Sequence, residues 1–310
     1  MTKGSYRKLR FMDMSKKLYI ECESGISGDM AVAALLDLGA DANKLQETLA
    51  SFRIDEEFDM KISSVMKSGL KATDFDVILP EENDNHDHDM KYLYGHLSRE
   101  DGHEDLAIAP HEHSDTASHE HQGAHQHENH DHYHGRGPVE IGNIFQNSNM
   151  TYGAKEVAMT ILDIIADAEA TVHGVPRDEV HFHEVGAVDS IVDIASFAIC
   201  YDDICHRYDI EDTIVSPLAE GHGTVRCQHG ILPVPVPAVT EIVGKHGIIF
   251  HKINVEGELV TPTGAAIAAA VGNKGSLPEK YRIIKTGLGA GKREYNTPGF
   301  VRMMILEEDR

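Results

Sequence analysis

Apolar and polar positions alternate along the chain with two different periods, and these periods predict its strands and helices. A period of two predicts strands at residues 17–23, 58–65, 72–79, 213–215, 248–255, 282–285 and 301–306. Helical spacing predicts helices at residues 29–38, 41–52, 140–146, 154–172, 193–205 and 263–271, and a helix ending at 239–244. Residues 221–237 and the glycine-rich stretch 287–293 are predicted to be loops. Without a regular strand–helix–strand repeat, these elements predict an α/β (or α+β) fold with a mixed sheet and flanking helices.

The pattern stops at residue 80. Residues 80–134 contain 14 acidic against two basic residues and 13 of the 21 histidines of the chain, with few apolar positions. Such a segment cannot bury enough apolar surface to fold alone, so we predict a long disordered, His-rich insertion at 80–138. The other expected parts are a flexible N-terminus at 1–16, an N-terminal α/β part at 17–79 and a main α/β part at 139–310. We expect 17–79 to form one domain with 139–310.

Charge and composition narrow the classes of function. The 28 basic and 51 acidic residues give a formal net charge of −23, which disfavours nucleic acid and anionic membranes as partners. No apolar run approaches the roughly 20 residues of a membrane helix, and the first residues lack the apolar core of a signal peptide. Four scattered cysteines without a C-x-x-C pair favour reduced thiols, so we expect a cytoplasmic protein.

The insertion itself predicts metal binding. Its histidines occur mainly as His-x-His pairs with acidic residues between them, and imidazole suits Ni²⁺, Cu²⁺ and Zn²⁺. Because chemistry needs fixed ligands, we expect this segment to buffer metal rather than to catalyse. A solvated segment with only incidental metal affinity is the alternative.

A second metal-binding pattern lies at residues 181–193. His181 and His183 would share one face of a strand, and Glu184 follows at once. Asp189 and Asp193 are four residues apart and would share one face of a helix. Together with Asp29, these residues are our candidate metal ligands for an open site of mixed nitrogen and oxygen donors. The alternative is a structural cluster in which Asp189 only caps the helix.

Two further patterns predict binding of a phosphate or catalysis. The turn with Ser24, Gly25, Ser27 and Gly28 precedes a helix, whose free N–H groups can hold an anion, although the turn lacks the Gly-Lys-Ser/Thr of a Walker loop. A second turn, with a nearby basic pair, offers the same chemistry. Its candidate binding residues are Thr261, Thr263, Gly264, Lys292 and Arg293. Glu256, Glu258 and His229 are candidate proton acceptors. Ordinary turn chemistry is the alternative for each of these patterns.

Taken together, the motifs resemble the LarC family of nickel insertion proteins. The matching blocks are CESGISGDM, HFHEVGAVDSIVDI, VSPL, GHGTVRCQHGILPVPVPA, EGELVTPTGAA and GLGAGKRE. The resemblance covers about residues 17–306 apart from the insertion. One departure is that Glu21 and Glu23 flank Cys22 where the family tends to have Asp and an aromatic residue.

The resemblance implies a nickel chelatase of the lyase class. Its substrate would be pyridinium-3,5-bisthiocarboxylic acid mononucleotide, into which Ni²⁺ is inserted with loss of a ring proton. The product would be the nickel-pincer cofactor of lactate racemase, which is the expected recipient. The family also implies CTP and a divalent metal (Mg²⁺ or Mn²⁺), bound through a C-terminal LarC-type domain or chain, and we expect this chain to represent the first part alone. We further expect a homo-oligomer.

Two other functions remain open from the sequence. A nickel storage or delivery chaperone without catalysis would explain the His-rich insertion but would not need phosphate-binding turns. A metal-dependent phosphohydrolase would use the His and Asp cluster and release phosphate from common nucleotides.

Overall fold

The computed structural model describes residues 15–52, 54, 57–80, 90–94, 136–180, 182, 188–227, 229–273 and 275–308. Within these residues the strands are β1 (Lys16–Glu21), β2 (Asp59–Lys67), β3 (Leu70–Ile78), β4 (Ile210–Val215), β5 (Leu218–His222), β6 (Thr224–Cys227), β7 (Gly230–Pro233), β8 (Phe250–Glu256), β9 (Tyr281–Ala290) and β10 (Phe300–Glu308). The helices are α1 (Gly28–Leu38), α2 (Ala42–Leu49), α3 (Met90–Tyr94), α4 (Pro138–Asn147), α5 (Tyr152–His173), α6 (Val188–Tyr208), α7 (Pro237–His246), α8 (Pro262–Val271) and the 3₁₀ turn η3 (Arg177–Glu179).

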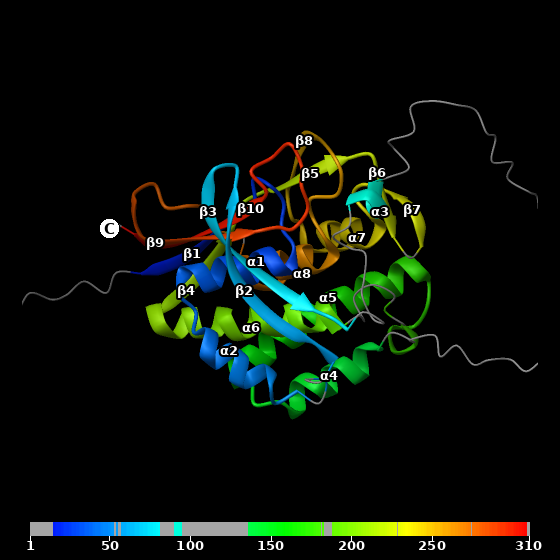
Figure 1. The fold of residues 1–310 in the computed structure, drawn as a ribbon, viewed down its shortest axis with the longest axis horizontal. Coiled ribbons are helices and arrows are strands. Elements are labelled where there is room, and N and C mark those ends of the chain that lie inside the picture. Colours follow the sequence, from blue (N-terminus) through cyan, green and yellow to red (C-terminus); the bar gives the residue numbers. More distant parts are fainter. Residues whose placement is uncertain are drawn as a thin grey trace, which may run out of the picture.

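A six-stranded mixed sheet organises the molecule (Figure 1). Its order is β2-β3-β9-β10-β1-β4, with β1 parallel to β4 and antiparallel to β10. Strands from both ends of the chain therefore lie in one sheet. Two small sheets, β5 with β8 and β6 with β7, complete the described strands. The predicted mixed sheet with flanking helices is confirmed.

Helix α1 lies unusually close to the sheet because glycines in β9 leave room for it. A Cβ atom on Gly289 would lie 2.0 Å from the carbonyl oxygen of Met30, and one on Gly287 would lie 2.4 Å from that of Ala34. Both contacts are shorter than atoms allow, so glycine is required at both positions for this packing.

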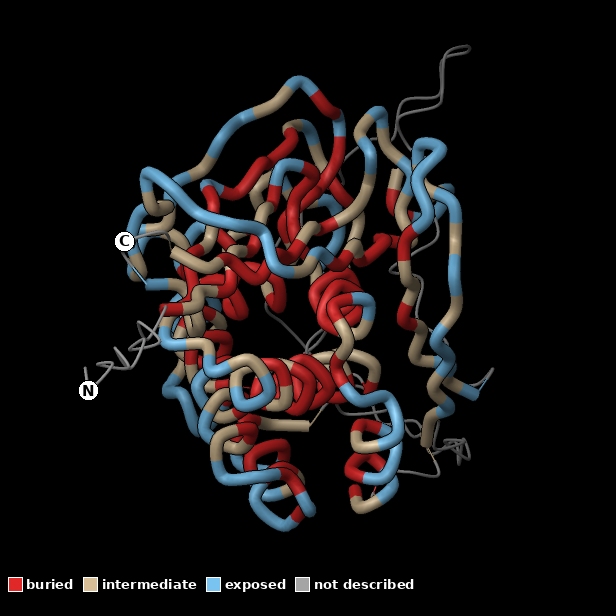
Figure 2. Tube along the Cα trace, turned by 90° about the vertical axis from the view of Figure 1, so that its left-hand side faces the viewer, coloured by how far each residue is buried: buried red, intermediate tan, exposed pale blue. Residues whose placement is uncertain are grey.

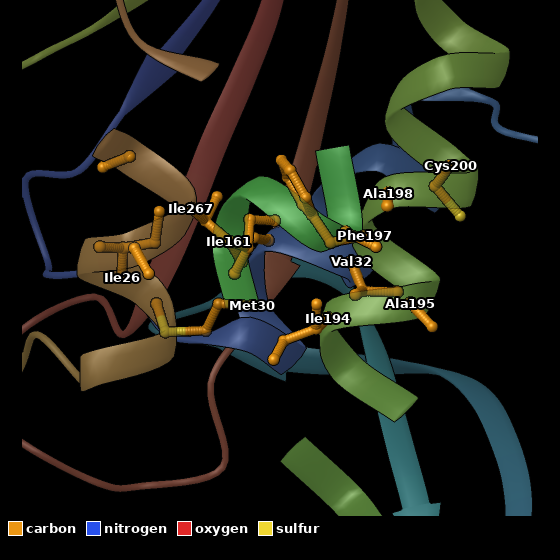
Figure 3. Packing of buried hydrophobic residues seen from close by; sticks show 14 of the residues in the cluster. Ile26, Met30, Val32, Ile161, Ile194, Ala195, Phe197, Ala198, Cys200 and Ile267 are labelled. Carbon is orange, nitrogen blue, oxygen red and sulfur yellow. The ribbon is translucent and has the colours of Figure 1, made fainter. Parts of the chain in front are cut away.

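The apolar core continues from α1 into the helical layer. Val32 of α1, Ile194 and Phe197 of α6, Ile161 of α5 and Ile267 of α8 are fully buried and face one another (Figure 3). In Figure 2, the sides of the helices that face the interior are coloured as buried, and the sides that face outward are coloured as exposed. Burial of these side chains stabilises the fold by about 1.5–3 kcal/mol each.

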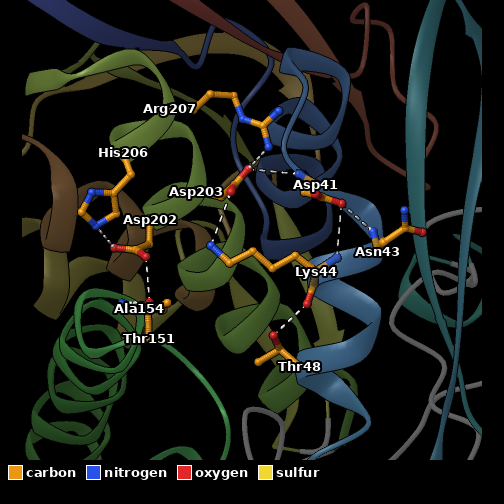
Figure 4. Close-up of polar contacts among 10 residues, drawn as sticks. All are labelled: Asp41, Asn43, Lys44, Thr48, Thr151, Ala154, Asp202, Asp203, His206 and Arg207. Atoms are coloured by element: carbon orange, nitrogen blue, oxygen red, sulfur yellow. Dashed lines mark hydrogen bonds and ion pairs between the residues drawn. The ribbon is translucent and has the colours of Figure 1, made fainter.

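Polar contacts of α6 fix its neighbours (Figure 4). Asp203 accepts from the backbone N–H of Asp41 at 3.1 Å and from the Nζ of Lys44 at 3.4 Å, which ties α6 to the start of α2. Asp202 accepts from the Thr151 hydroxyl at 2.7 Å, which ties it to the start of α5. These contacts hold the C-terminal half of α6 against the starts of α2 and α5.

Glu220 on β5 connects that strand with the segment before α8. Its carboxylate is 2% exposed and accepts from the backbone N–H groups of Gly221 at 2.8 Å and Leu259 at 2.9 Å. Burial raises the pKa of Glu220 to about 7, although the amide donors act in the opposite direction. The side chain of Glu220 thus links β5 to the segment before α8 by accepting a backbone hydrogen bond from it.

The structure differs from the predicted elements in four places. Residues 221–237, predicted to be a loop, contain the hairpin of β6 and β7, whose short strands carry no clear alternation. The predicted glycine-rich loop at 287–290 is the end of β9, because its glycines serve the approach of α1 rather than a turn. Residues 90–94, inside the predicted insertion, form α3, since Leu93 finds a buried position against the core. Helix α6 begins at Val188, before the periodic residues 193–205, and so includes Asp189, as the predicted shared helix face requires.

None of the helices in the described part of the chain combines the length and apolarity needed to cross a bilayer.

Replacing Gly289 by Ala should destabilise the protein by about 1–3 kcal/mol, because α1 must move away from β9 to accommodate the added Cβ. The matched control is Gly244→Ala in α7, where the added Cβ has no neighbour within 4 Å. That change should stabilise the protein by about 0.5–1 kcal/mol, since it removes a glycine from a helix interior. Urea denaturation of both variants measures the difference, and equal stabilities would contradict the close-packing argument.

Ionisation of Glu220 should make stability depend on pH. Its pKa is about 7 in the folded chain against 4.5 as the ordinary value, so between these values the folded state binds more protons than the unfolded state. Stability should then fall as pH rises through this window, by up to about 3 kcal/mol. Glu220→Gln keeps the accepting oxygen but cannot titrate, so its free energy of unfolding relative to wild type should rise between about pH 5 and about pH 8. Parallel pH dependences of both proteins would contradict this assignment.

Candidate functional site

A pocket lies where the start of α1, the start of α6, β6, the segment before α8 and the residues after β9 meet. Leu93 of α3 and Val77 of β3 contribute to its apolar lining. Its polar lining residues are Ser24, Ser27, Asp29, Asp189, Ser190, Asp193, Arg226, Cys227, Glu258, Thr261, Thr263, Lys292, Arg293 and Tyr295. The pocket thus gathers residues from three separate sequence patterns.

The turn before α1 and the turn before α8 contact each other through backbone hydrogen bonds. The N–H of Ile26 donates to the carbonyl of Leu259 at 2.9 Å, and the N–H of Thr261 donates to the carbonyl of Ile26 at 3.1 Å. A Cβ on Gly25 would lie 2.0 Å from the Leu259 oxygen, and one on Gly264 would lie 2.1 Å from the Ile26 oxygen. Gly25 and Gly264, predicted as binding residues, are absent from the pocket lining, and their position accounts for them as contact points between the turns.

Three carboxylates form one side of the pocket, which we call the acidic wall: Asp29, Asp189 and Asp193. The expected shared helix face of Asp189 and Asp193 is present, because both project from the start of α6 into the pocket. The Asp193 carboxylate packs on Gly28, where a Cβ would lie 2.6 Å from its Oδ2. Burial, followed by the charges of Asp29 and Asp189, raises the pKa of Asp193 well above the usual range. This wall attracts cations.

The turn at residues 24–28 is therefore a poor anion site. Ser27 precedes α1 but its hydroxyl bonds no amide of that helix and instead donates to Asp29. Asp193 also accepts a hydrogen bond from the backbone of Asp29. Since carboxylates already occupy this helix start, a phosphate would meet repulsion there. Ser24, Ser27 and Gly28 do line the pocket, but next to the acidic wall.

The two predicted basic residues already have carboxylate partners. Lys292 pairs with Asp76, and Arg293 Nη1 lies 2.6 Å from Glu258 Oε2. Burial lowers the pKa of Arg293, but Glu258 more than offsets this and the pKa lies well above its usual value. Glu258, with its buried ion pair, is poorly suited to accept a proton in a reaction.

Two tyrosines hold the backbone around Glu258. Its N–H donates to the Tyr94 hydroxyl at 3.0 Å, and the Tyr295 hydroxyl donates to its carbonyl at 2.9 Å. The two hydroxyls are themselves 2.7 Å apart. Tyr94 belongs to α3, so the segment that enters the predicted insertion is anchored at the pocket.

Arg226 is a pocket cation that is not among the binding residues predicted from the sequence. It lines the pocket from β6, its Nε is buried without a hydrogen-bond partner, and it forms no ion pair with any described carboxylate. Its guanidinium lies 5.9 Å from the ring centroid of Tyr92. The block GHGTVRCQHG was a signal for this residue, but sequence alone could not show that Lys292 and Arg293 are neutralised and Arg226 is not.

The start of α8 adds uncharged donors to the same pocket. Thr261 accepts from the N–H of Gly264 at 3.1 Å and caps the helix, while Thr263 lines the pocket. An N-terminus of a ten-residue helix with no carboxylate cap is favourable for an anion.

The remaining candidates lie elsewhere. Glu256 is exposed on β8 beside Gly223 and does not line the pocket. His229 is exposed next to Cys227, also outside the lining. His181, His183 and Glu184 lie outside the described residues, as does most of the His-rich segment. Among the described residues, no group of three or more His, Cys, Asp or Glu side chains is arranged to hold a metal ion.

The comparisons with known proteins agree on one family. Residues 18–310 match a family described as "Nickel insertion protein". A relative from Alkaliphilus metalliredigens, named pyridinium-3,5-bisthiocarboxylic acid mononucleotide nickel insertion protein, is 43% identical over 96% of this chain and 62% of its own length. Relatives of the same name from Akkermansia muciniphila and Geobacillus kaustophilus are 34% and 37% identical, each over 95% of this chain and 61% of their own length. The chain thus spans about three fifths of the length of these relatives. No solved structure matches it.

A match over nearly the whole chain, together with relatives above 30% identity, shows that this chain belongs to the nickel insertion protein family.

Proposed function

We propose that this chain carries the metal- and nucleotide-binding part of a nickel insertion reaction on pyridinium-3,5-bisthiocarboxylic acid mononucleotide. The names of its relatives support the reaction. The observation that carries the assignment is one pocket that has an acidic wall and, on other elements, the start of α8 and Arg226, an arginine with no carboxylate partner among the described residues. Such a pocket can receive a cation and an anionic ligand together.

The acidic wall is the proposed receiving place for Ni²⁺ inside the pocket. The carboxylates of Asp29, Asp189 and Asp193 attract the ion electrostatically into the pocket. They form no complete ligand set among the described residues, so further donors would come from other groups, such as water or the nucleotide. His181, His183 and Glu184 remain proposed additional ligands, since they directly precede α6 in the sequence.

The nucleotide phosphate is proposed to bind at Arg226 and the start of α8. Arg226 offers a bidentate guanidinium, and Thr263 offers its hydroxyl and its backbone N–H at the start of α8. Lys292 and Arg293 contribute less than expected because Asp76 and Glu258 neutralise them.

The proposed step exchanges one ring proton for one nickel ion. The two thiocarboxylate sulfurs bind Ni²⁺, the ring carbon between them forms a bond to nickel, and its proton passes to a carboxylate, so no oxidant or reductant is required. Asp193 is the proposed acceptor because a carboxyl with a raised pKa is a better base near neutral pH than Glu258 in its ion pair.

The finer features rest on the resemblance to the LarC family. We propose a chelatase of the lyase class that uses CTP with Mg²⁺ or Mn²⁺ through a C-terminal domain or chain. Lactate racemase is the proposed recipient, the cytoplasm is the proposed location, and the protein is proposed to be a homo-oligomer.

The direct test mixes the chain with Ni²⁺, CTP, Mg²⁺ and the bisthiocarboxylate mononucleotide. One arm adds the region that the relatives carry beyond this chain, and the other omits it. Mass spectrometry of the nucleotide should show the mass gain of one nickel less one proton. Bound nickel without any modified nucleotide in either arm would favour a storage protein, and phosphate release without nickelation would favour a phosphohydrolase.

Replacing Arg226 by Ala should raise the KM for the nucleotide by about 10- to 100-fold, because a charge-assisted contact with the phosphate is lost. Arg226→Lys should recover part of this loss, since it keeps the charge without the bidentate geometry. The control is Arg207→Ala, which removes an exposed arginine paired with Asp203 on α6 outside the pocket. An unchanged KM in Arg226→Ala would remove this residue from phosphate binding.

Replacing Asp193 by Asn should lower the rate of nickelation by about 100-fold, the scale of a lost general base. In the wild type the rate should rise with pH through the elevated pKa of Asp193, because only the ionised carboxylate accepts a proton or binds the ion. The variant should lack this rise, whereas Glu241→Gln on the exposed side of α7 should keep it. A wild-type pH profile in Asp193→Asn would exclude Asp193 as the acceptor.

A further inference from the structure

The hairpin of β6 and β7 carries a sulfur–nitrogen pair at the pocket. Cys227 ends β6 and pairs with Gly230 across the hairpin, and His229 lies in the turn between them. The Sγ of Cys227 and the Nδ1 of His229 are 4.0 Å apart. Cys227 is half-buried and lines the pocket, whereas His229 is exposed. The pair therefore extends from solvent to the pocket.

A second imidazole lies beside this pair. His173, at the C-terminal end of α5, has its ring centroid 5.1 Å from that of His229. Glu169, one turn earlier, lies 3.3 Å from the Nε2 of His173. Two exposed imidazoles and a thiol thus come together from a hairpin and a helix end that are far apart in the sequence.

We infer that Cys227 and His229 form a two-residue nickel-binding site at the rim of the pocket, from which the ion passes to the nucleotide. This inference rests on the proposed function and deepens it by assigning a place where the ion is held before insertion. Thiolate and imidazole are good ligands for late first-row metals such as nickel, and better suited to it than the carboxylates alone.

The distance between the two donors fits one ion. Metal–sulfur and metal–nitrogen bonds of about 2.3 Å and about 2.1 Å together exceed the 4.0 Å separation, so the two atoms are close enough for one ion to bond to both. Such bonding requires the thiolate form, so binding releases a proton.

Two protein ligands suit an ion in transit. An ion bound by two protein ligands keeps further coordination positions for water or for the incoming nucleotide. Sulfur donors of the thiocarboxylates can then replace the protein ligands one at a time. The ring of His173, which contacts Glu169, lies beside His229 and could offer a further imidazole ligand during the transfer.

The test uses the full chain and Ni²⁺ alone, with the near-ultraviolet thiolate-to-nickel charge-transfer absorption as the signal. Imidazole and carboxylate ligands do not produce this band, and the His-rich segment 80–134 contains no cysteine, so nickel bound there is silent. Cys22 and Cys200 are buried, which leaves Cys205 as the half-buried control thiol away from the pocket. Cys227→Ser should abolish the band and Cys205→Ser should retain it.

The imidazole is tested in the same titration. His229→Ala should shift the midpoint of the band to at least about tenfold higher Ni²⁺, since even loss of an outer partner of a metal ligand costs this much. A band that is absent in the wild type, that survives Cys227→Ser, that disappears in Cys205→Ser, or whose midpoint is unchanged in His229→Ala would overturn the inference. Nickelation of the nucleotide is measured separately, so a chain that shows the expected bands but transfers no nickel contradicts the proposed function and not this site.

Discussion

The site depends on direct backbone contact between two turns that are more than 200 residues apart. Ile26 exchanges hydrogen bonds with Leu259 and Thr261, and Gly25 and Gly264 allow the carbonyl oxygens to come within reach. Any side chain at these glycines would separate the turns, and with them the start of α1 from the start of α8. Glu220 supports the same junction from β5 through the N–H of Leu259. These contacts within the protein hold the starts of α1 and α8 together beside the pocket.

The two helix starts that these contacts bring together differ in the charges around them. The start of α1 faces carboxylates, whereas the start of α8 has a threonine cap and no carboxylate in its first turn. The two helix starts are thus chemically different although both belong to glycine-containing turns. Lys292 and Arg293 are held by Asp76 and Glu258, whereas Arg226 has no carboxylate partner among the residues that the structure describes.

The sequence predicted the fold well where periodicity was long and apolar. The helices at 29–38 and 154–172 and the strands at 17–23 and 301–306 match α1, α5, β1 and β10 closely. The sequence-based prediction failed where a residue type, here glycine, can serve either in a turn or in close packing. Glycines at 287 and 289 predict a loop by composition, yet they serve close packing of α1 on β9, a long-range contact that no local pattern contains.

The candidate site was predictable as a set of residues but not as a set of roles. Asp189 and Asp193 share the predicted helix face, and Ser27, Thr261 and Thr263 line one pocket with them. The pairing of cations with carboxylates is a tertiary property, so the sequence favoured Lys292 and Arg293 and overlooked Arg226. Cys227 and His229 are neighbours in the sequence, but only the fold shows that Cys227 lines the pocket with the aspartates.

A protein that inserts a metal must bind the ion and also release it, and this requirement sets the kind of site to expect. A closed set of four protein ligands, as in a structural zinc site, would hold the ion too tightly to surrender it. Interactions that stabilise only the bound ion lower the barrier to uptake but raise the barrier to transfer. Burial, together with the charges of Asp29 and Asp189, raises the pKa of Asp193, so that this carboxyl can hold a proton when no cation is near. An incomplete set of donors beside a group that can hold an anion is therefore the arrangement that the proposed transfer of an ion to a sulfur-rich ligand requires.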